Sequence, residues 1–163
     1  DLVWAASSLH EVAAPDRLLR DVYGALNPGG VLVVIEMDAP PRFLPDDVGR
    51  GRPGLASRCH EALAQANWNS HPNWGPQLER AGFAIAAQRS FSTEAGAAPG
   101  PGTIGRYAHA YLGRIRPALD GQLAGDDLTT LDRLLAPDRP DALLRRRDLT
   151  VRGSRTAWAA RRP

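Results

Sequence analysis

The run VLVVIEM at residues 31–37 is the feature that most constrains the fold. Its β-branched, continuously apolar character is typical of a strand covered on both faces. A shorter apolar run, LVWAA at residues 2–6, precedes it, and Leu18, Leu19, Val22 and Leu26 recur at helical spacing between the two. Pro15 is placed to start this helix and the NPGG stretch to end it. Strand, helix and strand within about 35 residues predict a right-handed parallel crossover unit.

The rest of the chain continues the alternation of helices and strands. The Pro/Gly-rich segment 39–53 is expected to be a loop long enough to be functional, since ligands of α/β folds bind over the carboxyl ends of strands. In the last predicted strand the alternation changes phase near Gly153, as a bulge would cause. The predicted helices are 55–68, 74–81, 104–119 and 128–135, and the further predicted strands are 82–93 and 149–162.

The basic residues exclude several classes of chemistry. Apart from the histidines they are all Arg, so a Schiff-base Lys, a P-loop Lys and a kinase Lys are all missing from the 163 residues. The formal net charge is +2, and the arginines are scattered without a basic stripe interleaved with aromatics. We therefore expect a solvated surface and no nucleic-acid partner.

Membrane, disulfide and metal chemistry are not expected either. The longest apolar runs are far shorter than the roughly 20 residues needed to cross a bilayer. A single cysteine, Cys59, cannot form an internal disulfide, which fits a reducing cytoplasm. The stretches HEVAAPD and HEALAQ begin like a zincin helix, but the fourth residue after each His is Ala, so we expect no metal.

The order of these segments resembles a known family. DLVWAASSLHEV, a helix, ALNPGGVLVVIE and then LERAGF before a strand resemble the fourth to sixth strands of class I S-adenosylmethionine-dependent methyltransferases. The final RGSRTAWAARRP resembles the seventh strand of that family, which runs antiparallel. The resemblance implies an α/β, partial Rossmann-like three-layer fold, with a mostly parallel sheet, an antiparallel last strand and a helical insertion at about 103–145. Residues 1–163 would form the C-terminal part of one methyltransferase domain.

Two features of the family are missing from these residues. The family carries a glycine-rich loop after its first strand and an acidic residue for the ribose at the end of its second. The stretch PGPGTIG near residue 100 follows a Pro/Ala hinge in place of a strand and does not match that loop. The resemblance therefore implies about a hundred further residues, three βα units, upstream of Asp1. This chain alone is expected to bind S-adenosylmethionine poorly.

The resemblance places the cofactor beside the end of the first strand, where small side chains allow a ligand to approach the backbone. The expected cofactor-binding residues are Ala5, Ala6, Ser7 and His10. His10 is also the candidate catalytic base, since the ordinary pKa of a histidine makes both proton states accessible near neutral pH. The alternative is a structural histidine that holds the loop.

Candidate residues for a small-molecule methyl acceptor follow the second strand and lie on later segments. Glu36 and Asp38 could orient an acceptor hydroxyl or amine, or could instead accept backbone N–H groups of the loop. Aromatic residues at helical spacing are more often core than lid. The expected substrate residues are Glu36, Asp38, His71, Trp74, Tyr107 and Tyr111.

Two functions remain open at this point. The first is methyl transfer from S-adenosylmethionine to a small molecule by in-line displacement. The second is a methyltransferase-like module without cofactor binding that serves as a binding or dimerisation partner. The strand at residues 2–6 bears on the choice, because without a neighbouring strand it would expose unpaired backbone groups and an apolar face. The sequence does not determine the oligomeric state.

Overall fold

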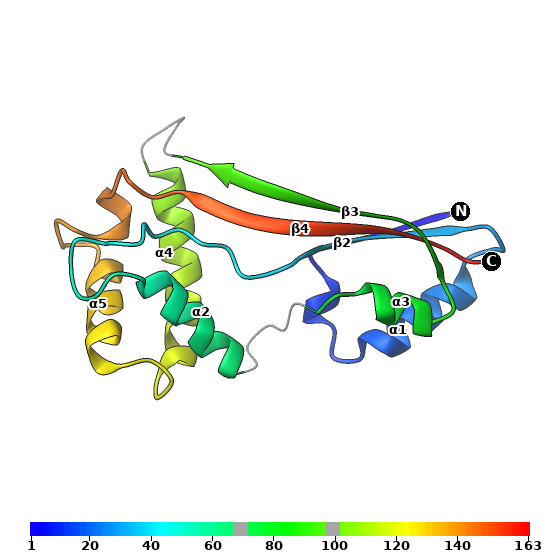
Figure 1. Ribbon diagram of the computed structural model, residues 1–163, viewed down its shortest axis with the longest axis horizontal. Coiled ribbons are helices and arrows are strands. Elements are labelled where there is room, and N and C mark those ends of the chain that lie inside the picture. The colour runs from blue at the N-terminus through cyan, green and yellow to red at the C-terminus, as the bar shows by residue number, and fades with distance from the viewer. Residues whose placement is uncertain (67–71, 97–101) are drawn as a thin grey trace. The chain divides into compact units, whose positions relative to one another are not determined.

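The computed structural model describes residues 1–66, 72–96 and 102–163 (Figure 1). The described chain divides into two compact units. The first contains residues 1–40, 72–92 and 153–163, and the second contains residues 41–66, 93–96 and 102–152.

The first unit is built on a mixed sheet of four strands. Its order is β1-β2-β4-β3, and β1 pairs with β2 in parallel from Leu2–Val31 to Ala6–Ile35. Strand β4 runs antiparallel to β2, with Val31 opposite Arg161. The α/β, Rossmann-like fold with an antiparallel last strand is therefore confirmed, and the sheet is not closed into a barrel. The elements are β1 (Leu2–Ala6), η1 (Leu9–Glu11), α1 (Pro15–Ala25), β2 (Val31–Met37), α3 (Gly75–Arg80), β3 (Ala84–Ala95) and β4 (Val151–Arg161).

Local sequence explains the crossover from α1 to β2. Pro15 begins α1, where a missing backbone N–H has no cost. The reversal after α1 uses Gly29 at φ +83° and Gly30, where a Cβ atom would lie 2.8 Å from the carbonyl oxygen of Asn27. A larger residue at position 30 would therefore displace the turn that starts β2.

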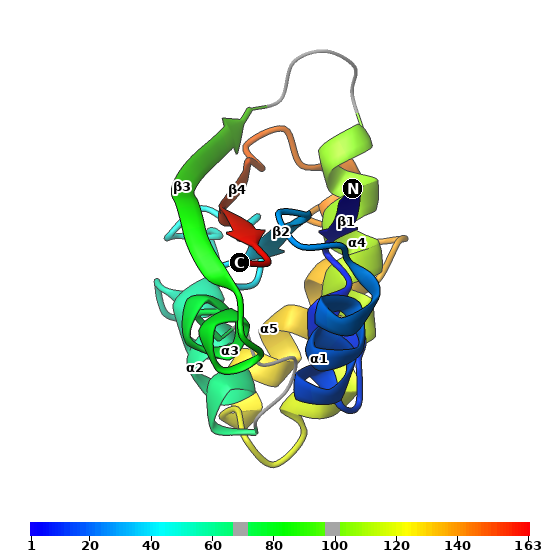
Figure 2. The same ribbon diagram turned by 90° about the vertical axis from the view of Figure 1, so that its right-hand side faces the viewer.

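Both helices of the first unit cover the same face of its sheet. Helices α1 and α3 lie on one side of the strands (Figures 1 and 2). Burial along β2 consequently alternates, with Leu32, Val34 and Glu36 buried and the residues between them only partly buried. The prediction that residues 31–37 are covered on both faces was wrong, because no helix of this unit's described residues lies over the second face. The core consists of Leu9, Leu19, Leu26, Leu32, Val34, Trp74, Leu78, Phe83, Trp158 and Ala160.

The predicted bulge coincides with the end of the regular β2–β4 ladder. The paired residues run from Arg161 to Arg155 on β4, and Arg152 forms a separate antiparallel bridge with Arg42. Gly153, where the sequence alternation changes phase, lies between these two pairings.

The second unit is helical around its own apolar core. It contains α2 (Leu55–Gln65), α4 (Thr103–Ile115), η2 (Arg116–Leu119), α5 (Gly125–Leu135) and η3 (Leu143–Arg145). Gly105 allows α4 to approach η3, since a Cβ there would lie 2.6 Å from the Leu143 carbonyl oxygen. The helices expected at 103–145 are thus present, and the segment 41–66 packs with them. Core residues include Phe43, Leu44, Leu55, Cys59, Leu63, Leu112, Ile115, Leu119, Leu131 and Leu143.

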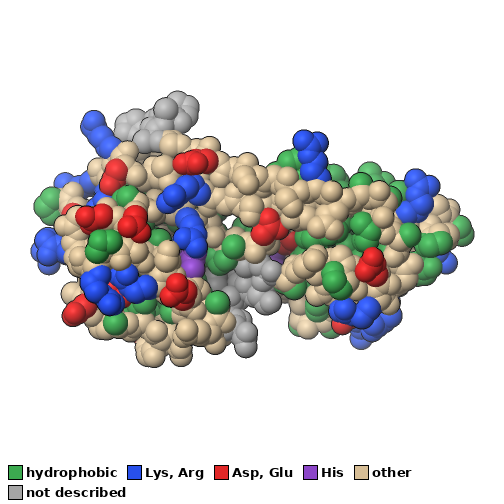
Figure 3. Space-filling model, in the orientation of Figure 1, with side chains coloured by type: hydrophobic (Ala, Val, Ile, Leu, Met, Phe, Trp, Pro, Cys, Tyr) green, Lys and Arg blue, Asp and Glu red, His purple; other side chains and the backbone are tan. Residues whose placement is uncertain are grey.

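The chain's surface and helices add two observations. On the face shown in Figure 3, basic and acidic side chains are interspersed and form no single-charge patch. Within residues 1–66, 72–96 and 102–163, every helix is too short or too polar to cross a membrane.

One buried carboxylate joins two segments of the second unit. Asp127, near the start of α5, is 2% exposed and accepts hydrogen bonds from Arg58 Nε at 2.7 Å, Arg58 Nη2 at 2.8 Å and Arg52 Nη2 at 2.9 Å. The bonds from Arg58 hold the pKa of Asp127 below its ordinary value, despite the opposing effect of burial. The bidentate pair with Arg58 ties α5 to α2.

We expect Asp127→Asn to lower the free energy of unfolding by about 3 kcal/mol at pH 7, because it breaks a bidentate ion pair at a buried position and leaves the partly buried Arg58 without its charged partner. Since the folded pKa is lowered, the stabilisation is complete above the unfolded pKa and is lost as pH falls through the folded pKa. The difference between wild type and variant in urea unfolding should therefore shrink below about pH 4. Asp126→Asn, at the same helix end but exposed, is the control. Equal losses for both variants would contradict the prediction.

Candidate functional site

The carboxyl ends of β1 and β2 lie together, because the two strands are parallel neighbours. The backbone N–H of Ser7, just after β1, donates to the Ile35 carbonyl oxygen of β2 at 2.8 Å. Ser7 has φ +49°, the one positive value at a non-glycine residue among the described residues. Such a conformation costs free energy and persists where neighbouring contacts fix it. The turn after β1 is therefore closely determined.

Glu36 fixes that turn from the neighbouring strand. Its side chain is 1% exposed, and Oε1 accepts the backbone N–H groups of Ser8 and Leu9, each at 2.7 Å. The other oxygen, Oε2, lies 2.7 Å from Nδ1 of His10. A buried carboxylate must be paired or hydrogen-bonded, and these three partners meet that requirement. Glu36 therefore organises residues 8–10 from within the sheet.

His10 is oriented inward by this contact. Its side chain is 5% exposed, and its second ring nitrogen, Nε2, lies 3.4 Å from Glu11 Oε1. Both ring nitrogens thus face carboxylates of the same turn. This geometry matches the alternative stated from the sequence, a histidine that holds the loop, and it also fixes the ring orientation that a base would need.

The other predicted cofactor residues lie along the end of β1. Ala6 is exposed, whereas Ala5 is partly buried and packs against the core under the sheet. Ser7 is partly buried, and its hydroxyl accepts a hydrogen bond from Arg155 of β4. Ala6 is exposed and Ser7 partly exposed, and both side chains are small, so a ligand could approach the chain closely here.

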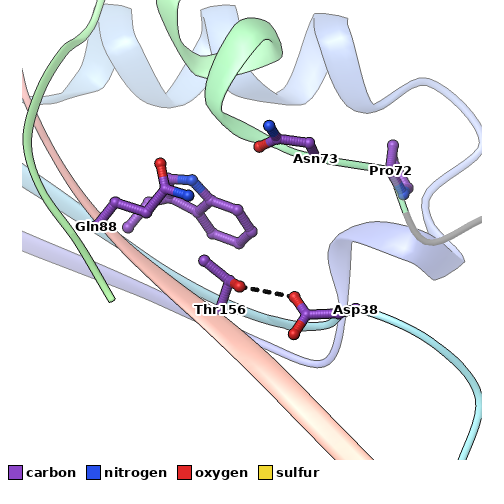
Figure 4. Close-up of a pocket in the computed structure, with 6 residues that line it drawn as sticks. Asp38, Pro72, Asn73, Gln88 and Thr156 are labelled. Carbon is purple, nitrogen blue, oxygen red and sulfur yellow. Dashed lines mark hydrogen bonds between the residues drawn. The ribbon is translucent and has the colours of Figure 1, made fainter. Parts of the chain in front are cut away.

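A pocket opens beside the end of β2 on the helix-covered face of the sheet (Figure 4). Its volume is about 300 Å³, within the range of small-molecule sites. The lining comes from the end of β2, from β3, from β4 and from the segment before α3. The lining residues are Asp38, Pro72, Asn73, Gln88, Thr156 and Trp158.

A chain of hydrogen bonds orients the carboxylate of Asp38. The hydroxyl of Thr156 donates to Asp38 Oδ1 at 2.7 Å, as Figure 4 shows. Ser90 Oγ lies 2.8 Å from Thr156 Oγ1. Because the Thr156 proton is directed to Asp38, Ser90 is the donor in the second bond. Asp38 Oδ1 is thus occupied, and the two hydroxyl protons are directed along the chain of bonds.

The aromatic wall of the pocket is Trp158, a residue not selected from the sequence. Trp158 is 3% exposed, and its indole Nε1 is buried without a hydrogen-bond partner among the described residues. The predicted Trp74 lies in the core of the first unit, and its Nε1 is also buried and unpartnered. Strand alternation is the signal for Trp158, since it points to the same face as Thr156, which pairs with Glu36.

The remaining predicted substrate residues are elsewhere in the described chain or outside it. His71 lies outside the described residues. Tyr107 and Tyr111 belong to the second unit, where their rings lie 4.8 Å and 5.5 Å from the Phe43 ring. Burial raises the pKa of Tyr111 to about 12, so its hydroxyl stays protonated near neutral pH. In the described residues, no group of three or more His, Cys, Asp or Glu side chains could hold a metal ion.

We expect Glu36→Gln to lower the free energy of unfolding by about 2 kcal/mol. Glutamine lacks the charge of the carboxylate, so its bonds to the Ser8 and Leu9 N–H groups are no longer charge-assisted, and its amide nitrogen cannot accept from a His10 Nδ1–H. Urea unfolding and amide hydrogen exchange at Ser8 and Leu9 would measure the loss. Glu11→Gln, exposed at the same turn, should change stability by less than about 0.5 kcal/mol. Unchanged protection of Ser8 and Leu9 in Glu36→Gln would show that Glu36 does not hold the turn.

Among the comparisons with known proteins, only the comparison with solved structures finds similar proteins. No protein-family model matches the chain. No curated protein matches it either.

Three solved structures illustrate the similarity. An inferred methyltransferase of Bacillus halodurans is 15% identical with a TM-score of 0.49, covering 99% of this chain and 64% of that protein. The cyclase SpnF is 20% identical with a TM-score of 0.38, covering 100% and 50%. Haemonchus contortus phosphoethanolamine N-methyltransferase 2, in complex with phosphomonomethylethanolamine and S-adenosylhomocysteine, is 15% identical with a TM-score of 0.41, covering 100% and 33%. The chain thus spans one third to two thirds of the lengths of these proteins, and at these values the similarity assigns no reaction to it.

Proposed function

We propose that this chain forms the acceptor-binding part of an S-adenosylmethionine-dependent methyltransferase acting on a small molecule. The observation that carries the proposal is the pocket at Asp38, beside the carboxyl ends of the parallel strands β1 and β2. Ligands of open α/β sheets bind at this edge. The family resemblance of the sequence motifs around the same two strand ends gives the reaction.

The described residues fit one side of a cofactor site. Exposed Ala6 and partly exposed Ser7 have small side chains at the end of β1, and the positive φ of Ser7 is held by contacts from β2 and β4. The glycine-rich loop and the ribose-binding acid of the family have no counterpart in the 163 residues. When bound, S-adenosylmethionine supplies a methyl group on a sulfonium.

The residues of the pocket position the acceptor for transfer. In the reaction the acceptor's lone pair forms the bond to the methyl carbon, the carbon–sulfur bond breaks with its electrons left on sulfur, and the acceptor releases a proton. Asp38 orients the nucleophilic group by accepting its hydrogen bond, and the exposed carboxylate passes the proton to water. Such positioning can account for much of the catalysis in an in-line displacement.

His10 acts in this proposal as a positioning residue. Its Nδ1 contact with Glu36 and its low exposure place it within the turn that carries Ala6 and Ser7. The turn's backbone, and not the imidazole, would then face the cofactor. A role as base requires the ring to leave Glu11 and open toward the acceptor, and unchanged turnover in His10→Ala would remove that role.

Binding of S-adenosylhomocysteine tests the proposed function. We expect it to shift the NMR amide signals of Ala6 and Ser7 in the product of the complete reading frame that encodes this chain. Ala6→Trp, which adds bulk at the exposed strand end, should weaken binding at least about tenfold, a loss of 1.4 kcal/mol. Ala86→Trp, also at an exposed strand position, is the control. Binding that leaves Ala6 and Ser7 unshifted would refute the proposed site.

A second candidate function is favoured by the edge of the sheet. Strand β1 lies at the end of the strand order, and Leu2 and Trp4 are 65% and 61% exposed. An exposed apolar edge strand can pair with another chain. This observation supports a module that associates through β1, with a second copy as the partner to test first.

Under the second function, Leu2→Lys should raise the protein concentration at which self-association begins by about tenfold, since burial of a leucine contributes about 1.5 kcal/mol or more. Sedimentation velocity over a concentration series measures this change. Leu144→Lys, at an exposed leucine of the second unit, is the matched control. A chain that stays monomeric at all concentrations would exclude self-association through β1.

A further inference from the structure

We propose that the pocket at Asp38 selects a small acceptor that carries an amine. The inference rests on the proposed function for its reaction, methylation at nitrogen, but the selection of the amine depends on the pocket alone. The relevant features are the charge of the lining, the free oxygen of its carboxylate, the aromatic wall and the size.

The described residues give the lining a negative charge, against the balance of the whole chain. Asp38 is the one ionisable residue among the six described residues that line the pocket, and no arginine is among those six. The full sequence has 20 basic residues and 18 acidic ones, so a pocket lined by an acid and by no arginine differs from the average charge of the chain. A carboxylate or phosphate on the acceptor would meet like charge here, whereas an ammonium group would meet opposite charge.

The hydrogen-bond chain leaves one carboxylate oxygen for the ligand. Thr156 donates to Oδ1 of Asp38, and Ser90 donates to Thr156, so both hydroxyl protons are already used. Among the described residues no donor bonds to Oδ2 of Asp38, and this oxygen is acceptor-only while the acid is ionised. A ligand N–H donor therefore matches Asp38, and a charged donor gives the stronger bond.

The polar amides and the indole complete the selection. Asn73 and Gln88 lie across the pocket from Asp38 in Figure 4. Each carries an amide carbonyl that can accept from a nitrogen donor, although Asn73 Oδ1 already accepts from the Gly75 N–H at 3.1 Å. Trp158 is 3% exposed and lines the pocket with a small part of its ring, and an aromatic ring attracts a cation more than an anion. The volume of about 300 Å³ limits the ligand to a small molecule.

In the amine's methylation, its neutral nitrogen donates the lone pair to the methyl carbon and the carbon–sulfur bond breaks with its electrons on sulfur. The product ammonium then releases one proton to water beside exposed Asp38. The amine must therefore be bound in equilibrium with its unprotonated form, and Asp38 both selects the charged form and lies next to the proton that leaves.

Three probes of similar shape and different charge test the selection without any cofactor: benzylamine, benzyl alcohol and benzoate. Binding to the 163-residue chain is followed by the NMR signal of the Trp158 indole N–H, identified by its loss in Trp158→Phe. We expect benzylamine to shift this signal and to bind at least about tenfold tighter than the alcohol, with benzoate weakest, as a charge-assisted hydrogen bond predicts.

Variants at Asp38 decide the outcome. Asp38→Asn keeps an oxygen for Thr156 and should remove the preference for benzylamine, whereas Asp21→Asn, an exposed acid on α1, should retain it. Gln88→Glu adds a second carboxylate at an exposed position and should tighten benzylamine binding several-fold, which keeps the test valid if Asp38→Asn does not fold.

Equal binding of the three probes, tighter binding of benzoate, or a preference that survives in Asp38→Asn would overturn the amine assignment. If benzylamine is selected as expected while S-adenosylhomocysteine leaves Ala6 and Ser7 unshifted, the methyltransferase function fails and the amine site stands. If S-adenosylhomocysteine binds at Ala6 and Ser7 but the amine is not selected, only the acceptor class is wrong.

Discussion

The candidate site depends on the hydrogen bonds by which Glu36 holds the turn after β1. A carboxylate buried in a sheet must find partners, and Glu36 finds all of them in residues 8–10, which directly follow the neighbouring parallel strand. The parallel pairing of β1 with β2 brings the two strand ends together, and the buried acid then converts this proximity into a fixed turn. The positive φ of Ser7 and the inward orientation of His10 belong to the same arrangement.

Glu36 and Asp38 are two residues apart and point to the same face, yet their surroundings give them different tasks. Glu36 lies within β2 under the helices, and both of its carboxylate oxygens are bonded to protein groups. Asp38 follows the last residue of the strand, where the sheet gives way to the pocket, so Thr156 occupies only one of its oxygens. Two carboxylates that are two residues apart thus differ in role: Glu36 accepts hydrogen bonds from the protein, and Asp38 faces the pocket.

Much of the fold could be predicted from the sequence because local signals agreed with one another. The spacing in residues 15–26, the NPGG reversal and the β-branched run at 31–37 specify a strand–helix–strand unit, and the structure has it. Whether helices cover one face or both faces of residues 31–37 could not be predicted, since a β-branched run does not indicate on which face of the strand helices will pack. The antiparallel direction of β4 came from the family resemblance, and not from the alternation of its residues.

The site was less accessible to sequence reasoning. Asp38 was selected for its place after a buried strand, and its position at the pocket follows from that topology. Asn73, Gln88, Thr156 and Trp158 come from three separate segments, and each looks like an ordinary surface or core residue until the sheet order brings them together. Trp74 was a predicted substrate residue because it is an aromatic residue in a turn-rich stretch, but its indole lies in the core. The sequence patterns did not predict the strand register that places Thr156 opposite Glu36.

The uncovered side of the first unit's sheet connects the two candidate functions. By the register of β1, β2 and β4, one face carries Leu2, Trp4, Val33 and Ile35, and neither α1 nor α3 packs on it. Exposed apolar surface of this kind is unfavourable in water, and it lies beside an edge of β1 that no described strand pairs with. In a methyltransferase it would be covered by a further helical layer, and in an association module by a partner. The turn held by Glu36 does not depend on such a cover, because the three contacts of Glu36 join β2 to residues 8–10. The pocket, built from the end of β2, β3, β4 and the segment before α3, lies on the opposite face.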